Sequence, residues 1–92
     1  MAKNFRMHTK ETGNQCLALY LSGDFDGSSA CELVQVLDEH VNTKTKVAID
    51  TSGLREIARF GRVVFLARMS WLQDKRADIE VTGRFREIFL EA

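Results

Sequence analysis

The chain has 92 residues, a length that supports a single domain over residues 1–92 and is too short for two. Its residues are 45% hydrophobic and 28% charged, which is typical of a folded globular protein and not of a disordered segment. The 13 basic and 13 acidic side chains balance, whereas a protein that binds nucleic acid usually carries a basic excess, so we expect no nucleic-acid partner.

A β-hairpin is predicted at the start of the chain. Residues 5–10 form a short edge strand, residues 11–14 carry a turn signal, and residues 16–22 alternate as a second strand. In this second strand one face is formed by Leu17, Leu19 and Leu21, and the other by Cys16, Ala18 and Tyr20.

An amphipathic helix is predicted next. Residues 29–32 have the form of a capping box that begins with Ser29 and ends with Glu32. Apolar residues then recur at helical spacing: Ala30, Leu33, Val34, Leu37 and Val41. Ahead of the helix, Asp24 and Asp26 are interpreted as turn residues and as negative charge at its amino terminus. Weak binding of Mg²⁺ by this pair is the less favoured alternative.

The remaining elements alternate between strand and helix. Residues 46–50 predict a short apolar strand in the centre of a sheet, followed by a loop to about Phe60. A helix is predicted from about residue 61 to 74, a strand over residues 78–82, and a short terminal helix after Gly83. The order β-β-α-β-α-β-α predicts an α/β fold with a mixed four-stranded sheet packed with helices.

The second predicted helix is apolar on two sides. With residues 100° apart, one stripe, which can pack on the sheet, contains Phe60, Val64, Ala67 and Trp71. A second stripe on nearly the opposite side contains Phe65, Met69 and Leu72. Either the terminal helix or the opening strand covers the second stripe, or the stripe is an exposed patch that contacts a protein partner or a second copy in a homodimer.

Four arginines decorate the same region: Arg55, Arg59, Arg62 and Arg68. They can pair with carboxylates of a partner, or hold a phosphate or a nucleotide. Simple solvation is the more common state of such side chains, because isolated surface charges contribute little.

Residues for catalysis and for metal binding are sparse. His8 and His40 lie apart from any nucleophile motif, and no glycine-rich phosphate-binding motif is present. Cys16 and Cys31 lack C-x-x-C spacing, which disfavours both zinc and a disulfide scaffold. The first residues lack the apolar core of a signal peptide, and no stretch reaches membrane-spanning length. We therefore expect a cytoplasmic protein, not embedded in a membrane, that is no enzyme and holds no metal or cofactor.

Three segments of the chain resemble the STAS domain, a module shared by bacterial anti-sigma-factor antagonists and the cytoplasmic tails of sulfate transporters. Residues 21–26 are similar to the family's strand followed by G-x-hydrophobic-D, and residues 47–54 to its central strand and D-x-S-G turn. Residues 83–89 are similar to its closing helix. The resemblance covers nearly the whole chain and implies that the family's site positions fall on Asp26, Asp50, Ser52, Gly53 and Ala58.

The loop after D-x-S-G departs from the family pattern. In the signalling members this loop carries an aspartate, two small hydroxylated residues and a glycine, and a partner kinase phosphorylates one hydroxyl. Counting forward from Gly53, the same stretch is Ala58-Arg59-Phe60-Gly61. Alanine replaces the aspartate and Phe60 stands at the acceptor position, so the alignment predicts no phosphorylation at the usual site.

The resemblance implies a non-catalytic protein–protein interaction module of bacterial signalling, similar to an anti-sigma-factor antagonist without its phosphoacceptor. The implied partner is a kinase-like anti-sigma factor or another regulator that binds STAS domains. The residues expected to contact it are Arg55, Arg59, Phe60, Gly61, Arg62, Phe65, Met69 and Leu72. Two alternatives are an accessory subunit of a lipid-trafficking ABC transporter, bound to the transporter ATPase, and a nucleotide-binding regulatory domain.

Overall fold

A computed structural model of the chain describes residues 4–40, 46–72 and 78–90. Within these residues the elements are β1 Arg6–Gly13, β2 Cys16–Phe25, α1 Gly27–His40, β3 Lys46–Ile57, α2 Arg59–Leu72, β4 Asp78–Thr82 and α3 Arg86–Leu90. The predicted α/β class and the order β-β-α-β-α-β-α are confirmed. None of the helices in this part of the chain is long and apolar enough to cross a membrane.

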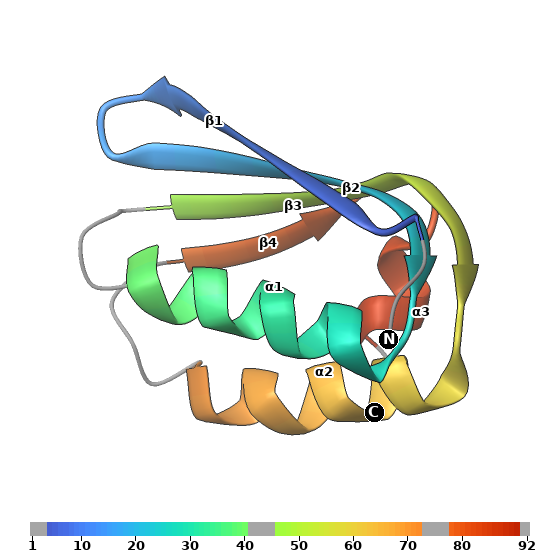
Figure 1. Ribbon diagram of the computed structural model, residues 1–92. Coiled ribbons are helices and arrows are strands. Elements are labelled where there is room, and N and C mark those ends of the chain that lie inside the picture. The colour runs from blue at the N-terminus through green and yellow to red at the C-terminus, as the bar shows by residue number, and fades with distance from the viewer. Residues whose placement is uncertain (1–3, 41–45, 73–77, 91–92) are drawn as a thin grey trace.

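The four strands form one mixed sheet in the order β1-β2-β3-β4. β1 runs antiparallel to β2, whereas β2, β3 and β4 are parallel to one another. Each parallel step is made through a helix, and because such crossovers are right-handed, α1 and α2 both lie on the same face of the sheet (Figure 1). No described helix covers the opposite face.

The core lies between this sheet and its helices. Strand alternation turns the leucine face of β2 toward the helices, together with apolar side chains of the two neighbouring parallel strands. On this face the sheet buries Leu17, Leu19, Leu21, Val47, Ile49 and Val81, and α1 adds Ala30, Leu33, Val34 and Leu37. The predicted apolar face of the first helix is therefore confirmed, except for Val41, which lies outside the described residues.

Three phenyl rings close the core at the carboxyl ends of the strands. The ring centroids of Phe25 and Phe65 are 6.2 Å apart, and Phe89 lies 4.9 Å from each of them. All three side chains are almost fully buried. Because they come from β2, α2 and α3, the cluster joins the sheet, one of the crossover helices and the terminal helix.

The prediction of a loop after residue 50 is wrong, because β3 continues to Ile57. The second half of β3 pairs with the end of β2, from Ser22 opposite Gly53 to Phe25 opposite Ile57, and the register is irregular between these two pairs. Gly53 permits this pairing, since a Cβ there would lie 2.6 Å from the Leu21 carbonyl oxygen. In the sequence, Gly53 resembles a residue that ends a strand. In the structure, β2 supplies hydrogen-bond partners for the backbone of β3, and the chain therefore stays extended past Gly53.

The first helix begins earlier than predicted, and Asp26, not Ser29, is its capping residue. The Asp26 carboxylate oxygen Oδ1 accepts hydrogen bonds from the Ser29 amide at 3.0 Å and from the Ser29 hydroxyl at 3.1 Å. Ser29 is buried at the third helical position, and its hydroxyl oxygen also lies 3.1 Å from the Asp24 carbonyl, so the two acceptors share its one proton. Asp26, just before the helix, is the better cap because its negative carboxylate also interacts favourably with the positive end of the helix dipole.

Three further boundaries differ from the prediction by a few residues. β2 ends at Phe25 instead of at residue 22. β1 extends through Gly13, so that the hairpin turn lies at Asn14 and Gln15 instead of at residues 11–14. α2 begins at Arg59, two residues before the predicted start. The predicted end of this helix, at residue 74, lies outside the described residues.

Candidate functional site

The amino termini of α1 and α2 meet at the carboxyl edge of the parallel strands, where ligands bind in many open α/β sheets. A Cβ at Gly27, the first residue of α1, would lie 2.7 Å from the Phe60 ring. A Cβ at Gly61 would lie 2.7 Å from the Asp26 carbonyl group. The two helices therefore start in close contact. Only glycine fits at Gly61, where the added Cβ would meet backbone, whereas at Gly27 it would meet the exposed Phe60 ring.

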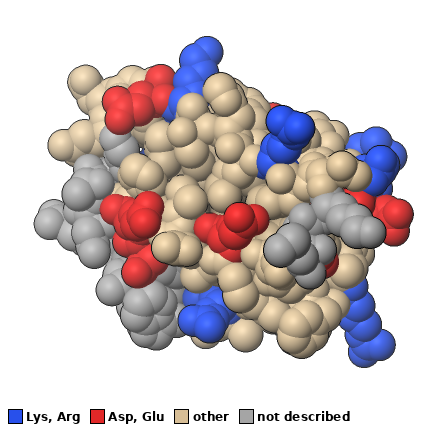
Figure 2. Space-filling view, viewed as in Figure 1, with Lys and Arg blue, Asp and Glu red and all other residues tan. Residues whose placement is uncertain are grey.

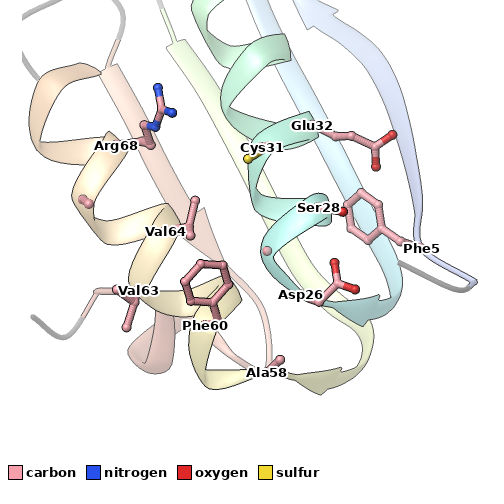
Figure 3. A pocket seen from close by; sticks show the side chains of 12 residues that line it. Phe5, Asp26, Ser28, Cys31, Glu32, Ala58, Phe60, Val63, Val64 and Arg68 are labelled. Atoms are coloured by element: carbon pink, nitrogen blue, oxygen red, sulfur yellow. The ribbon is translucent and has the colours of Figure 1, made fainter. Parts of the chain in front are cut away.

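A groove of about 1140 Å³ lies over this junction, between the amino-terminal halves of α1 and α2 (Figure 3). We refer to it as the α1–α2 groove. Its lining is largely apolar and comprises Phe5, Asp26, Gly27, Ser28, Cys31, Glu32, Ala58, Phe60, Val63, Val64, Ala67 and Arg68. Such a composition suits contact with apolar side chains better than it suits chemistry on a small polar substrate.

Phe60 is the largest apolar surface in the α1–α2 groove. Its side chain is 69% exposed, and Figure 3 shows the ring projecting from the start of α2 toward α1. On α2, Val63 is 50% exposed. Ala67 is also exposed, and Val64 between these positions is half-buried against the core. Large exposed apolar residues that adjoin one another mark a contact surface in a protein of this size.

The charges in the groove differ between its two walls. The α1 wall carries Asp26 and Glu32, and the α2 wall carries Arg68. Backbone hydrogen bonding from Ser29 lowers the pKa of the Asp26 carboxyl, so this side chain is ionised at neutral pH. Figure 2 shows that positive and negative side chains over the visible face are scattered among neutral ones, without a continuous area of either sign.

The two predicted stripes of α2 are exchanged at most of their described positions, although Val64 packs against the core as predicted. Phe65, predicted on the partner-binding stripe, is 1% exposed and packs in the phenylalanine cluster, and Met69 is half-buried against the same core. Phe60, predicted to pack on the sheet, points outward. The alternative in which the terminal helix covers the Phe65 stripe is confirmed, because α3 places Phe89 on that ring. The side chains of Trp71 and Leu72 lie outside the described residues.

The arginines of this region do not act as a group. Arg55 forms two hydrogen bonds with Asp24, Nε to Oδ1 at 3.1 Å and Nη2 to Oδ2 at 2.9 Å, which tie the end of β3 to the end of β2. Arg59 is exposed beside Phe60, whereas Arg62 is half-buried. Asp26 serves as the helix cap, as the preferred interpretation predicted. Asp24 does not form a turn, because it lies within β2 and pairs both carboxylate oxygens with Arg55.

The D-x-S-G residues hold the backbone together and do not line the α1–α2 groove, as far as the described residues show. The Asp50 carboxylate accepts a hydrogen bond from the Ser52 amide at 2.8 Å. The Ser52 hydroxyl accepts one from the Arg84 amide at 3.3 Å, and Thr51 accepts one from the Phe85 amide at 3.0 Å. These bonds join the middle of β3 to the turn that leads into α3.

Several groove residues escaped sequence reasoning, among them Phe5, Gly27, Glu32 and Val63. They come from three separate segments, and nothing local in the sequence indicates that these segments meet. The one signal in the sequence was the pair Gly27 and Gly61. A glycine in the first turn of each of two successive helices suggests that the starts of the two helices approach each other closely. Across the part of the chain that the structure describes, no three His, Cys, Asp or Glu side chains gather to hold a metal ion.

No protein-family model matches the chain. No curated protein sequence matches it either. Among solved structures, the protein Mglu aligns at a TM-score of 0.73 with 19% identity over 86% of this chain. The chain spans 20% of the length of that Mglu chain.

Two anti-sigma factor antagonists also match. One, from Mycobacterium paratuberculosis, aligns at a TM-score of 0.66 with 18% identity, over 91% of this chain and 73% of its own. The other, SpoIIAA in its unphosphorylated form, aligns at 0.67 with 13% identity, over 91% of this chain and 81% of its own. Identities this low show the fold alone, so the predicted STAS-like fold of the anti-sigma factor antagonists is confirmed.

Proposed function

We propose that the chain is a non-catalytic signalling module that binds a protein partner through the α1–α2 groove. The observation that carries the proposal is Phe60, a large apolar side chain 69% exposed at the mouth of that groove. By alignment with the signalling members of the fold, Phe60 takes the place of the phosphoacceptor. A phenyl ring accepts no phosphate, and it adds apolar contact area where a charge would otherwise be introduced.

Complementarity with the α1–α2 groove defines the chemistry of the partner. Its apolar side chains pack on Phe60 and Val63, and its basic side chains face Asp26 and Glu32 on the α1 wall. A kinase-like anti-sigma factor is the partner class that the fold suggests. Binding would then be continuous and would be controlled by the amount or the state of the partner, because this position lacks a hydroxyl group.

The proposal is tested with the double substitution Phe60→Asp, Val63→Asp. Partners captured from a bacterial lysate by the wild-type chain are identified, purified and titrated by calorimetry against both proteins. We expect the variant to bind at least tenfold more weakly, since it places charge in the apolar contact. We also expect wild-type binding to weaken as salt is added.

Tyr20→Asp is the matched control, because Tyr20 is 40% exposed on the face of the sheet away from the helices. Circular dichroism first establishes that all three proteins are folded. The proposal is overturned if the groove variant retains full affinity for every partner, or if Tyr20→Asp weakens binding as much.

A further inference from the structure

The α1–α2 groove continues past the amino-terminal halves of its two helices. A smaller hollow of about 230 Å³ follows it along α1 and is lined by Cys31, Val34, Gln35, Asp38 and Arg68. Cys31 and Arg68 also line the α1–α2 groove, so the two depressions adjoin. We call the two together the long groove. From Gly27 to Asp38 the axis of α1 rises by roughly 16 Å, which is the length that an occupant can cover.

Each wall of the long groove follows one stripe of a helix. The stripe of α1 contains Ser28, Cys31, Gln35 and Asp38, and that of α2 contains Phe60, Val63 and Ala67. Residues three and four apart lie on one face of a helix. The two helices run side by side from the same end, and their stripes border a common valley (Figures 1 and 3). The side chains of a third helix fit such a valley as ridges fit into grooves.

The walls of the long groove offer an occupant no sheet edge. α1 and α2 are helices of 14 residues each, and between their first and last turns the backbone N–H and C=O groups bond within the helix. An extended segment laid against the apolar lining would therefore bury backbone groups that have no partner there. A helix satisfies its own backbone and contacts the walls with side chains alone. The long groove thus favours a helical occupant.

Charge on the two walls specifies the polar sides of this helix. The exposed carboxylates Glu32 and Asp38 border the long groove about 9 Å apart along α1. On the opposite wall the exposed apolar side chains are Phe60 and Val63. Arg68 borders both depressions from the α2 side, where it suits an acidic side chain. A complementary helix is therefore apolar toward α2 and basic toward α1.

We infer that the protein partner inserts an amphipathic helix of about three turns lengthwise between α1 and α2. Its apolar stripe packs on Phe60 and Val63, and its Lys or Arg side chains face Glu32 and Asp38. This inference rests on the proposed function and adds to it the secondary structure, the length and the charge pattern of the segment that binds.

Selection from a peptide library tests the inference without knowledge of the natural partner. Phage-displayed random peptides of about 16 residues, long enough for three turns and both ends, are selected on the full wild-type chain. They are counter-selected on the folded variant Phe60→Asp, Val63→Asp. We expect the enriched peptides to carry apolar residues at helical spacing with Lys or Arg beside them. Synthetic copies should gain helical circular dichroism when they bind.

Charge-swapped variants test the orientation of the bound helix. The peptide that binds most tightly is titrated by fluorescence anisotropy against the wild type and against Glu32→Lys with Asp38→Lys. The matched control is Asp78→Lys with Glu87→Lys, at exposed positions that line neither depression. Each substitution changes the charge by two, so both variants move from +0 to about +4. We expect the groove variant to bind at least tenfold more weakly than the control.

Three results would overturn the inference: no peptide is enriched, the enriched peptides show the alternating pattern of a strand, or the two charge variants bind alike. The proposed function is judged separately, by the partners captured from the lysate. A natural partner that requires Phe60 and Val63 but contacts them with a strand or a loop would support the proposed function and overturn the helical occupant.

Discussion

At the scale of single residues, two phenylalanines five positions apart on α2 have opposite surroundings. Phe65 is 1% exposed within the phenylalanine cluster, whereas Phe60 is 69% exposed and touches Gly27 of the neighbouring helix. A helical wheel separates the two residues onto different sides but does not indicate which side faces the core. The two sides of the helix are similarly hydrophobic. Only the position of the neighbouring elements therefore distinguishes a core residue from a contact residue.

Truncation of the two rings should distinguish these roles. Phe65→Ala is expected to lower the free energy of unfolding by about 3–5 kcal/mol, because it leaves a cavity between β2 and α3. Phe60→Ala should change it by about 0.5 kcal/mol or less, as is usual at the surface. Urea titration followed by circular dichroism measures both. Phe65→Leu gives an intermediate value if the alanine variant does not fold. Equal losses for Phe60→Ala and Phe65→Ala would contradict the structure.

The cap of α1 gives a prediction about pH. In the folded chain, hydrogen bonding lowers the pKa of the Asp26 carboxyl below its ordinary value of 3.8. The ionised carboxylate therefore stabilises the fold fully above pH 3.8, and this stabilisation is lost as the pH falls through the lower pKa of the folded state. Asp26→Ala should cost about 1 kcal/mol at pH 7. Asp26→Asn keeps an oxygen acceptor and should cost less.

The two capping variants are compared by urea titration between pH 7 and pH 2. The difference between the wild type and Asp26→Asn should shrink toward the acid end, where the wild-type carboxyl is protonated. A difference that is constant over this pH range would show that the carboxylate charge plays no part in capping α1.

At the scale of elements, the turn between β4 and α3 depends on β3. Gly83 has a φ of 95°, and a Cβ there would lie 2.6 Å from the Ser52 hydroxyl oxygen and 2.8 Å from Asp50 Oδ1. The Arg84 amide donates to the same Ser52 hydroxyl. The D-x-S-G segment thus positions α3, which in turn supplies Phe89 to the core.

Gly83→Ala should therefore loosen α3. We expect a loss of roughly 1–3 kcal/mol in the free energy of unfolding, from backbone strain and from the contact with Ser52. Faster amide hydrogen exchange is expected across α3 Arg86–Leu90. Gly13→Ala is the matched control, because Gly13 also has a positive φ but has nothing within 4 Å of an added Cβ. If the control lost as much stability and α3 exchanged no faster, the proposed link from Ser52 to α3 would be wrong.

At the scale of the whole molecule, the sheet separates a helical side from a side without described helices. Two right-handed crossovers place α1 and α2 on one side of the sheet, and no described helix lies on the other side (Figure 1). Mglu, of which this chain spans 20%, carries the same fold within a longer chain, and the fold alone therefore does not define a function.

Local sequence patterns were sufficient to predict the order of elements, the leucine face of β2, the apolar face of α1 and the mixed sheet. These features depend on periodicity and on turn chemistry, which act between residues close in the chain. The motif order was also sufficient to identify the STAS-like fold, although individual motifs were weak.

Contacts between distant segments decided the remainder. β3 extends past Gly53 because β2 offers it backbone partners, and Asp26 caps α1 in preference to Ser29. The groove takes its residues from the start of the chain, α1 and α2, and the orientation of α2 depends on Phe89, located 24 positions after Phe65. A single sequence contains the apolar residues of both sides of α2. Only packing against the other elements decides which side is buried, because the free energy of burial depends on the neighbours a side chain meets.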